Sequence, residues 1–243
     1  MTYVFVGAVG FLIGLAAHDL AIQSLSETTP LRPFQGICRV CLHERSWFHV
    51  RCGRCGRAVV REAILALVSA AVAIAFLHTV GWNWLLVPYL GFLLLTTALV
   101  VTDLEAFRIV DRLNLRGSAV LVGLLTLTTA VDGDWGDMGR GVAGGAAYFA
   151  GASLLFVLAR GRGFGAGDVK LSVQLGVFTA YLGWSVLGWA VFGTALIGGV
   201  VAFVLILGGA ASRKTELPYG PPMILGAWTA IVMVGVGAIP IPS

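Results

Sequence analysis

The sequence predicts an all-α protein, a polytopic bundle of about eight transmembrane helices with one small polar loop. Three observations predict this fold: the scarcity of charge, the repetition of long apolar segments, and the clustering of basic residues in alternate loops. Of the 243 residues, 58% are hydrophobic and 12% are charged, whereas an average soluble domain is roughly 25% charged. So few charged residues cannot cover a soluble fold of this length, and we expect the lipid bilayer to surround most of the surface.

Apolar segments account for the predicted spans, since a transmembrane helix needs about 20 mostly apolar residues. The eight segments are 2–24, 62–80, 84–102, 117–131, 140–159, 168–182, 185–207 and 221–240. The fourth and sixth are short for a full span, which leaves their ends open. The first lacks the basic start and the small-x-small cleavage site of a signal peptide, so we expect it to be retained.

The polar stretch 25–61 divides the chain into three parts. Residues 1–24 are the first transmembrane helix, 25–61 a cytoplasmic loop, and 62–243 the main transmembrane domain. Within this domain, the small residues of 141–153 and 193–199 are typical of helices that pack closely in membranes. A simple bias in composition is the alternative explanation for them.

Positive charge is segregated along the chain. With eight spans, every basic residue but Arg140 falls on one side of the membrane, and Arg140 lies beside the acidic loop of Asp132, Asp134 and Asp137. Basic loops are typically cytoplasmic, so this side is predicted to face the cytoplasm and both termini to face outward. An odd number of spans would scramble the segregation. We expect a multi-pass protein of the cytoplasmic membrane and no nucleic-acid partner.

The polar loop contains all four cysteines, in the pattern C-x2-C-x10-C-x2-C. They are Cys38, Cys41, Cys52 and Cys55. Two C-x2-C pairs present four thiolates to one tetrahedral Zn²⁺ ion, and a site with four protein ligands is structural rather than catalytic. A reducing cytoplasm disfavours disulfides. We therefore predict a small zinc knuckle, with four reduced thiols in a metal-free loop as the alternative.

Two aspartates occupy unusual positions at the predicted membrane edge. Asp103 follows the apolar run LLLTTALVVT, and Asp168 opens the sixth segment on the same side of the membrane. Carboxylates at such positions are functional candidates. If the two approach each other, one stays protonated while the other is ionised, which is the division of labour of aspartic proteases. The alternatives are that Asp168 is a helix N-cap and Asp103 a loop charge.

Glycines alternate with other residues directly before Asp168. Gly163, Gly165 and Gly167 let the backbone approach a substrate closely. An extended peptide can hydrogen-bond there as an added strand. A GK[ST] sequence does not follow, so the pattern does not favour nucleotide binding.

Together these residues resemble the type IV prepilin peptidases, a bacterial family of GxGD aspartyl proteases. A cysteine loop between the first two helices and an early acidic residue in the second, here Glu62, match the family's order. The other matching stretches are Asp103 to Leu113, with Val110 where the family has proline, Gly165-Ala166-Gly167-Asp168-Val169-Lys170-Leu171, and Pro218-Tyr219-Gly220-Pro221. The resemblance covers nearly the whole chain, and the ordered set is more specific than any single motif.

The resemblance implies a membrane-embedded aspartic endopeptidase that removes the short basic leader of prepilins or pseudopilins at the cytoplasmic membrane face. Asp103 and Asp168 carry over as the catalytic pair, and the resemblance places six further motif residues at the substrate site: Gly165, Gly167, Lys170, Pro218, Gly220 and Pro221.

Larger members of the family also methylate the new N-terminus with S-adenosylmethionine. Here the cysteine pairs are only ten residues apart, and the family's G-S-F-L-N pattern is reduced to Gly14-Leu15-Ala16-Ala17-His18. These departures leave methylation, and with it the use of S-adenosylmethionine, an open expectation.

Two other classes of function remain as alternatives. In a transporter or channel, Asp103 and Asp168 would bind ions or protons, although the sequence has no evident inverted repeat. In a pilus or secretion assembly factor, the zinc loop would act without catalysis.

Overall fold

The computed structural model describes residues 1–25, 36–37, 44–45, 60–158, 164–208 and 218–239. In this part of the chain the all-helical prediction is confirmed, apart from one short hairpin. The helices are α1 Thr2–Leu25, α2 Val60–Val80, α3 Leu86–Ala106, α4 Asp111–Asp132, α5 Trp135–Leu158, α6 Ala166–Leu182, α7 Trp184–Leu207 and α8 Gly220–Gly235. The hairpin pairs β1 Gly36–Ile37 with β2 Glu44–Arg45 in antiparallel register.

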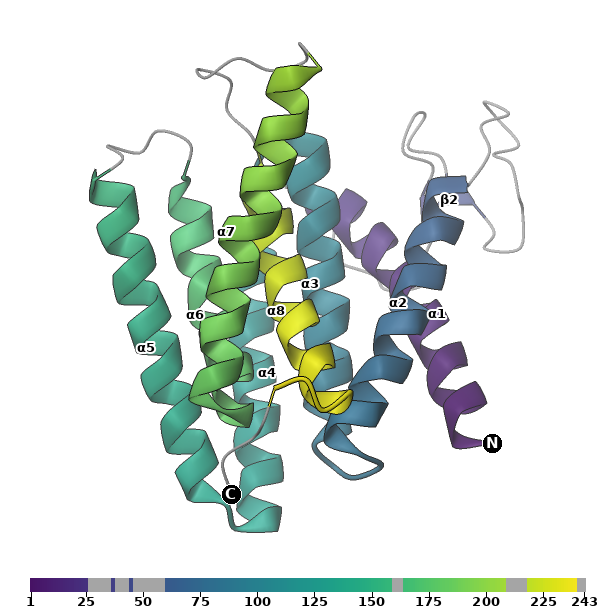
Figure 1. Ribbon diagram of the computed structural model, residues 1–243. Helices are drawn as coiled ribbons and strands as arrows, with labels where there is room; N and C mark the ends of the chain where they lie inside the picture. The colour runs from purple at the N-terminus through teal and green to yellow at the C-terminus, as the bar shows by residue number, and fades with distance from the viewer. Residues whose placement is uncertain (26–35, 38–43, 46–59, 159–163, 209–217, 240–243) are drawn as a thin grey trace.

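Successive helices run up and down, so the first residue of α1 and the last turn of α8 lie at the same end of the bundle (Figure 1). The helix ends that flank the basic segments predicted to be cytoplasmic lie at the opposite end, which is called here the basic end. Six helices are long and apolar enough to cross a membrane. The other two described helices, α6 and α8, are shorter at 17 and 16 residues. The prediction of eight full spans therefore stays a prediction.

The ends of three helices differ from the predicted ones, in two cases because charged residues lie within the helix. The fourth helix was predicted at 117–131 but begins at Asp111. The prediction missed its first two turns because they carry Arg112 and Arg116, which end the apolar segment. The third continues through Asp103 to Ala106. The last ends at Gly235 rather than at residue 240, and Gly237 follows with φ +72°.

Helix α3 is the central element on which the site depends. The Tyr89 hydroxyl donates a hydrogen bond of 2.7 Å to the Phe178 carbonyl of α6. The Trp228 indole of α8 donates to the Thr96 hydroxyl at 3.1 Å. Both α6 and α8 are therefore joined to α3 by buried hydrogen bonds.

Glycines allow the backbones of neighbouring helices to touch. A Cβ atom at Gly144 of α5 would lie 2.1 Å from the Cβ atom of Ala180 in α6. At Gly226 of α8 it would lie 2.6 Å from the Thr194 backbone nitrogen of α7. Close packing through the small residues of 141–153 and 193–199 is thus confirmed.

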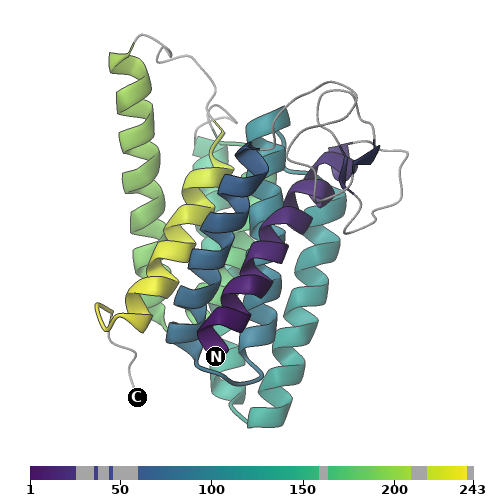
Figure 2. The ribbon, with the colours of Figure 1, turned by 90° about the vertical axis from the view of Figure 1, so that its right-hand side faces the viewer.

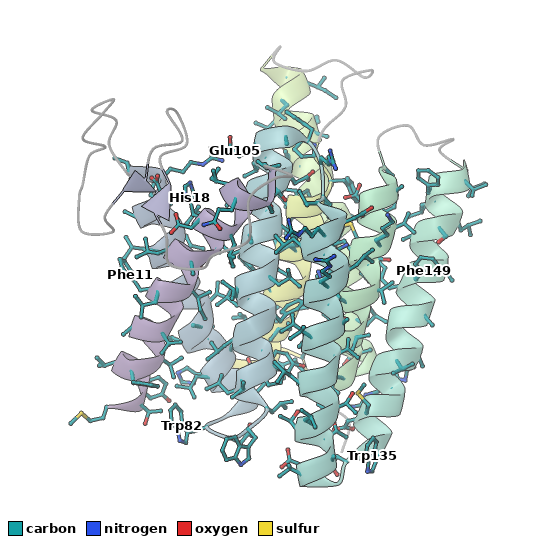
Figure 3. The ribbon with its side chains drawn as sticks, turned by 180° about the vertical axis from the view of Figure 1, so that it is seen from behind. Phe11, His18, Trp82, Glu105, Trp135 and Phe149 are labelled. Atoms are coloured by element: carbon teal, nitrogen blue, oxygen red, sulfur yellow. The ribbon has the colours of Figure 1, made fainter. Side chains whose placement is uncertain are left out.

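Tryptophans mark the end of the bundle opposite the basic end. Trp82 and Trp135 lie there, while His18 and Glu105 lie at the basic end (Figure 3). The exposed fractions of the two tryptophans are 63% and 57%. Exposed tryptophans gather at membrane–water interfaces, so this end has the composition of a bilayer boundary.

Arg140 is the one basic residue predicted to lie on the other side of the membrane from the rest, and it forms hydrogen bonds near this tryptophan end. It donates hydrogen bonds to the carbonyls of Ala180 and Tyr181 in the last turn of α6. It also pairs with Asp137 at 2.9 Å. Its guanidinium therefore satisfies carbonyls that the end of α6 leaves without intrahelical partners.

Candidate functional site

Asp103 lies in the last turn of α3 with a buried carboxyl group that is bound to the start of α8. Its exposed fraction is 5%, and its Oδ2 atom accepts a hydrogen bond of 3.1 Å from the Gly220 backbone N–H. A Cβ atom at Gly220 would lie 2.8 Å from the same oxygen, so only glycine fits this contact. Pro221 follows in the first turn of α8, where the absence of an N–H group costs no helical hydrogen bond.

Asp168 occupies the first turn of α6 and is buried to a similar degree, with an exposed fraction of 6%. Its Oδ2 atom accepts a hydrogen bond of 2.8 Å from the backbone N–H of Gly165. Gly165 is the N-cap residue, and Asp168 stands three positions later. The capping alternative thus holds in modified form: the Asp168 carboxylate closes the first turn without being the N-cap itself.

Two glycines next to the aspartates, Gly167 and Gly220, adjoin the same side chain, Ile109, in the turn between α3 and α4. A Cβ atom at Gly167 would lie 3.0 Å from the Ile109 Cβ atom. At Gly220 it would lie 3.4 Å from Ile109 Cδ1. Gly167 precedes Asp168 and Gly220 binds Asp103, and the charge of Asp103 acts electrostatically on Asp168. The ends of α3, α6 and α8 thus gather around Ile109, with the two acids within electrostatic reach of each other.

Two aromatic residues border this pair. The rings of Phe164 and Tyr219 meet edge to face with centroids 5.3 Å apart, and Tyr219 is within electrostatic reach of Asp168. Pro218 precedes Tyr219 and is half-buried. These residues form an apolar rim beside the acids.

Tyr148 of α5 is a neighbour of the site that sequence reasoning missed. Its hydroxyl lies 3.4 Å from the Thr194 hydroxyl of α7, and it too is within electrostatic reach of Asp168. In the sequence it is one aromatic residue within an apolar run, so no signal set it apart. Only the packing of α5 against α6 places it near the aspartates.

Lys170 belongs to the matched motif but contacts neither aspartate of the pair. Its ammonium group binds Asp111 at the start of α4, with 2.6 Å between Nζ and Oδ2. Both side chains are largely exposed. The ion pair joins α4 to α6 two residues after Asp168, so Lys170 is placed to support the arrangement from outside.

The predicted metal ligands Cys38, Cys41, Cys52 and Cys55 lie outside the described residues. Within the described part of the chain, no three His, Cys, Asp or Glu side chains converge as a metal site. The zinc knuckle therefore stays a prediction.

Comparison with known proteins gives relatives but no family model. Neither a family model nor a solved structure matches the chain. Two proteins of Aeromonas salmonicida, one of them from strain A449, are 31% identical over 193 residues and are named prepilin leader peptidase/N-methyltransferase. The match covers 76% of this chain and 63% of each relative. A protein of Stutzerimonas stutzeri with the same name is 34% identical over 79 residues, 32% of this chain and 26% of its own length.

Proposed function

This chain is a relative of the prepilin leader peptidases, and from that premise we propose that it is a membrane-embedded aspartic endopeptidase for type IV prepilins or pseudopilins. One observation carries the proposal. Two buried carboxyl groups, Asp103 of α3 and Asp168 of α6, are within electrostatic reach of each other at the basic end of the bundle. The chain matches less than two thirds of the length of the Aeromonas salmonicida relatives. Its activity and its substrate are therefore both part of the proposal.

The chemistry follows from the closeness of two acids. Two neighbouring carboxyl groups do not ionise together readily, so the pair holds one proton and titrates as a unit. The ionised member takes a proton from a water molecule, whose oxygen attacks the scissile carbonyl carbon. The protonated member hydrogen-bonds to the carbonyl oxygen and then supplies the proton for the leaving amine. The backbone N–H groups of Gly220 and Gly165 hold the two carboxyl groups in place.

The position of the pair agrees with a basic leader followed by an apolar helix. Basic loops connect the helices at this end, which we assign to the cytoplasmic face by the positive-inside rule. We propose that the apolar helix of the substrate stays in the bilayer while the leader crosses this edge. An extended substrate segment would lie along the backbone at Gly165, which is itself extended with φ −89° and ψ 158°. Gly167 lies within α6, and its open side is filled by Ile109.

We further propose that the four cysteines bind one structural zinc ion. In support, β1 and β2 pair on either side of Cys38 and Cys41 and so close the segment that contains the first cysteine pair. N-methylation with S-adenosylmethionine is proposed as a second activity, on the name that the relatives carry.

A cleavage assay tests the peptidase proposal. The chain is co-expressed with a prepilin in cells that lack their own peptidase, and leader removal is followed by the change in pilin mass. Asp103→Asn and Asp168→Asn should each abolish cleavage at normal protein levels. Asp134→Asn is the matched control, because Asp134 is exposed in the loop at the tryptophan end. Full cleavage by either site variant would refute the assignment of the pair.

A further inference from the structure

Phe107, the residue directly after α3, has a backbone conformation that its side chain disfavours. Its φ is +50° and its ψ is +37°, and every other described residue with a positive φ is a glycine. In this left-handed region a Cβ atom crowds the backbone, which costs free energy for most residues other than glycine and asparagine. Strained residues of this kind gather at functional sites, so Phe107 is a functional candidate.

Contacts on both sides of Phe107 hold this conformation. Its backbone N–H donates a hydrogen bond of 2.9 Å to the Asp103 carbonyl and so closes the last turn of α3. Two residues later, the buried Ile109 side chain packs against Gly167 and against Gly220, the first residue of α8. The start of α8, in yellow, lies at the basic end at the top of Figure 2. The chain thus reverses direction at Phe107 beside the glycines that adjoin the two aspartates.

The protein itself offers the Phe107 ring little contact in return for this cost. The exposed fraction of Phe107 is 67%. Leu104, its neighbour across one helical turn, is 44% exposed. Apolar side chains this exposed gain free energy only when something outside the chain covers them. We therefore looked for the class of partner that fits an apolar ring at the edge of the site.

The surroundings of Phe107 favour a peptide over lipid as this partner. Glu105 and Arg108 flank it in the sequence, and Glu105 lies at the basic end of the bundle (Figure 3). Charged side chains mark the polar boundary of a bilayer, where tryptophan and tyrosine are enriched because their rings carry a polar group. Phenylalanine has no such group. An apolar side chain of a bound peptide therefore suits the ring better than the lipid headgroup region does.

We propose that Phe107 is a specificity-determining residue whose ring packs against the first apolar side chain after the scissile bond; this inference rests on the proposed peptidase function. In the proposed substrate, the basic leader ends and the apolar helix begins at that bond. Phe107 stands one turn after Asp103, so a substrate residue next to the reacting carbonyl comes within reach of its ring. The ring gains these contacts only in the complex, which makes them available for discrimination between substrates.

A double-mutant cycle between protein and substrate tests the contact. Purified protein in detergent micelles cleaves either a prepilin or the same prepilin with alanine as the first residue of its apolar helix, and kcat and KM are measured. Phe107→Gly and Phe107→Asn both permit the left-handed backbone while they remove the ring. Each should raise KM for the unaltered prepilin about tenfold, while kcat stays within about twofold. Neither should lower the unfolding temperature, because the backbone strain is relieved.

The alanine prepilin gives the second side of the cycle. The unaltered protein should show the same rise in KM with it, and Phe107→Gly should add little to that rise, because both changes remove one contact. Phe192→Ala is the matched control, since Phe192 of α7 is 56% exposed and should affect neither constant.

Three outcomes would overturn the inference while leaving the peptidase proposal intact. The first is additive effects of the two changes, which would mean that the ring and the substrate residue are independent. The second is a lower unfolding temperature with a matching loss of kcat, as expected if the ring supports the fold. The third is an effect seen in vesicles of phosphatidylethanolamine and phosphatidylglycerol but not in micelles, because the ring would then anchor the protein in lipid. An unaltered protein that cleaves no prepilin would overturn both proposals.

Discussion

The carboxyl group of Asp103 is bound to the backbone of Gly220, 117 positions later in the chain, by a hydrogen bond of 3.1 Å. This contact joins the end of α3 to the first residue of α8. It explains why a glycine opens the last helix, and it makes the P-Y-G-P segment part of the candidate site rather than a simple helix start.

Gly220→Ala should therefore inactivate the site without unfolding the protein. The new Cβ atom would lie 2.8 Å from Asp103 Oδ2 and 3.3 Å from its Cγ atom, which forces the carboxyl group out of position. A displacement of about 1 Å at a catalytic group costs roughly a hundredfold in rate. Prepilin cleavage and thermal unfolding in detergent measure the two effects. Gly199→Ala, which would meet nothing within 4 Å, should cleave normally.

Gly144→Ala should destabilise the contact between α5 and α6. Its Cβ atom would lie 2.1 Å from the Ala180 Cβ atom, and overpacking of this kind typically costs about 1–3 kcal/mol. The double variant Gly144→Ala, Ala180→Gly removes that clash and should recover part of the loss. Unfolding in detergent is the measurement, and equal stability of the single and double variants would contradict the packing.

Tyr89→Phe should lower stability by about 0.5–1.5 kcal/mol, because it removes the buried hydrogen bond between α3 and the Phe178 carbonyl. Tyr3→Phe is a suitable control, since Tyr3 lies exposed near the start of α1. An unchanged free energy of unfolding for Tyr89→Phe would show that the hydrogen bond contributes nothing.

The Asp111–Lys170 ion pair should contribute little stability, about 0–1 kcal/mol, because both side chains are largely exposed. Reversing one charge with Lys170→Asp places two acids together and should lower stability. The swap Asp111→Lys, Lys170→Asp should restore it. A double-mutant cycle measured by unfolding in low salt gives the coupling, and a cycle without coupling would argue against the pair.

Metal analysis should find about one zinc ion per chain if the four cysteines form a tetrahedral site. Cys52→Ser or treatment with a strong chelator should release the metal and lower resistance of the cysteine loop to protease. A preparation free of zinc, with full activity and unchanged proteolysis, would remove the metal from the proposal.

Sequence patterns predicted where helices exist better than where they end. Apolar composition located every described helix, but it placed Asp103 outside the third, because a charged residue at a membrane edge looks like the start of a loop. The same reasoning missed the first turns of α4, where Arg112 and Arg116 are helical. Charge marks the limit of the lipid-facing stretch, not the limit of backbone hydrogen bonding.

Local motifs also predicted the acids of the candidate site but not their surroundings. Asp103 and Asp168 stand out by position along the chain, whereas Tyr148 and Ile109 reach the site only through tertiary packing. Whether His18 of α1 faces Glu62 of α2 depends on how closely the two helices approach each other. The spacing of glycines in the sequence suggests a close approach but does not fix it. The sequence patterns of a single chain do not determine which distant segments come into contact.

The binding of Arg140 to the end of α6 has a consequence for membrane insertion. During synthesis, the Arg140 guanidinium near the start of α5 opposes transfer of the α4–α5 hairpin across the bilayer. In the folded protein the same group donates hydrogen bonds to two backbone carbonyls of α6 and pairs with Asp137. In the proposed orientation, the basic residues of the other loops outweigh Arg140, and Arg140 makes its contacts with α6 only after it has crossed the bilayer.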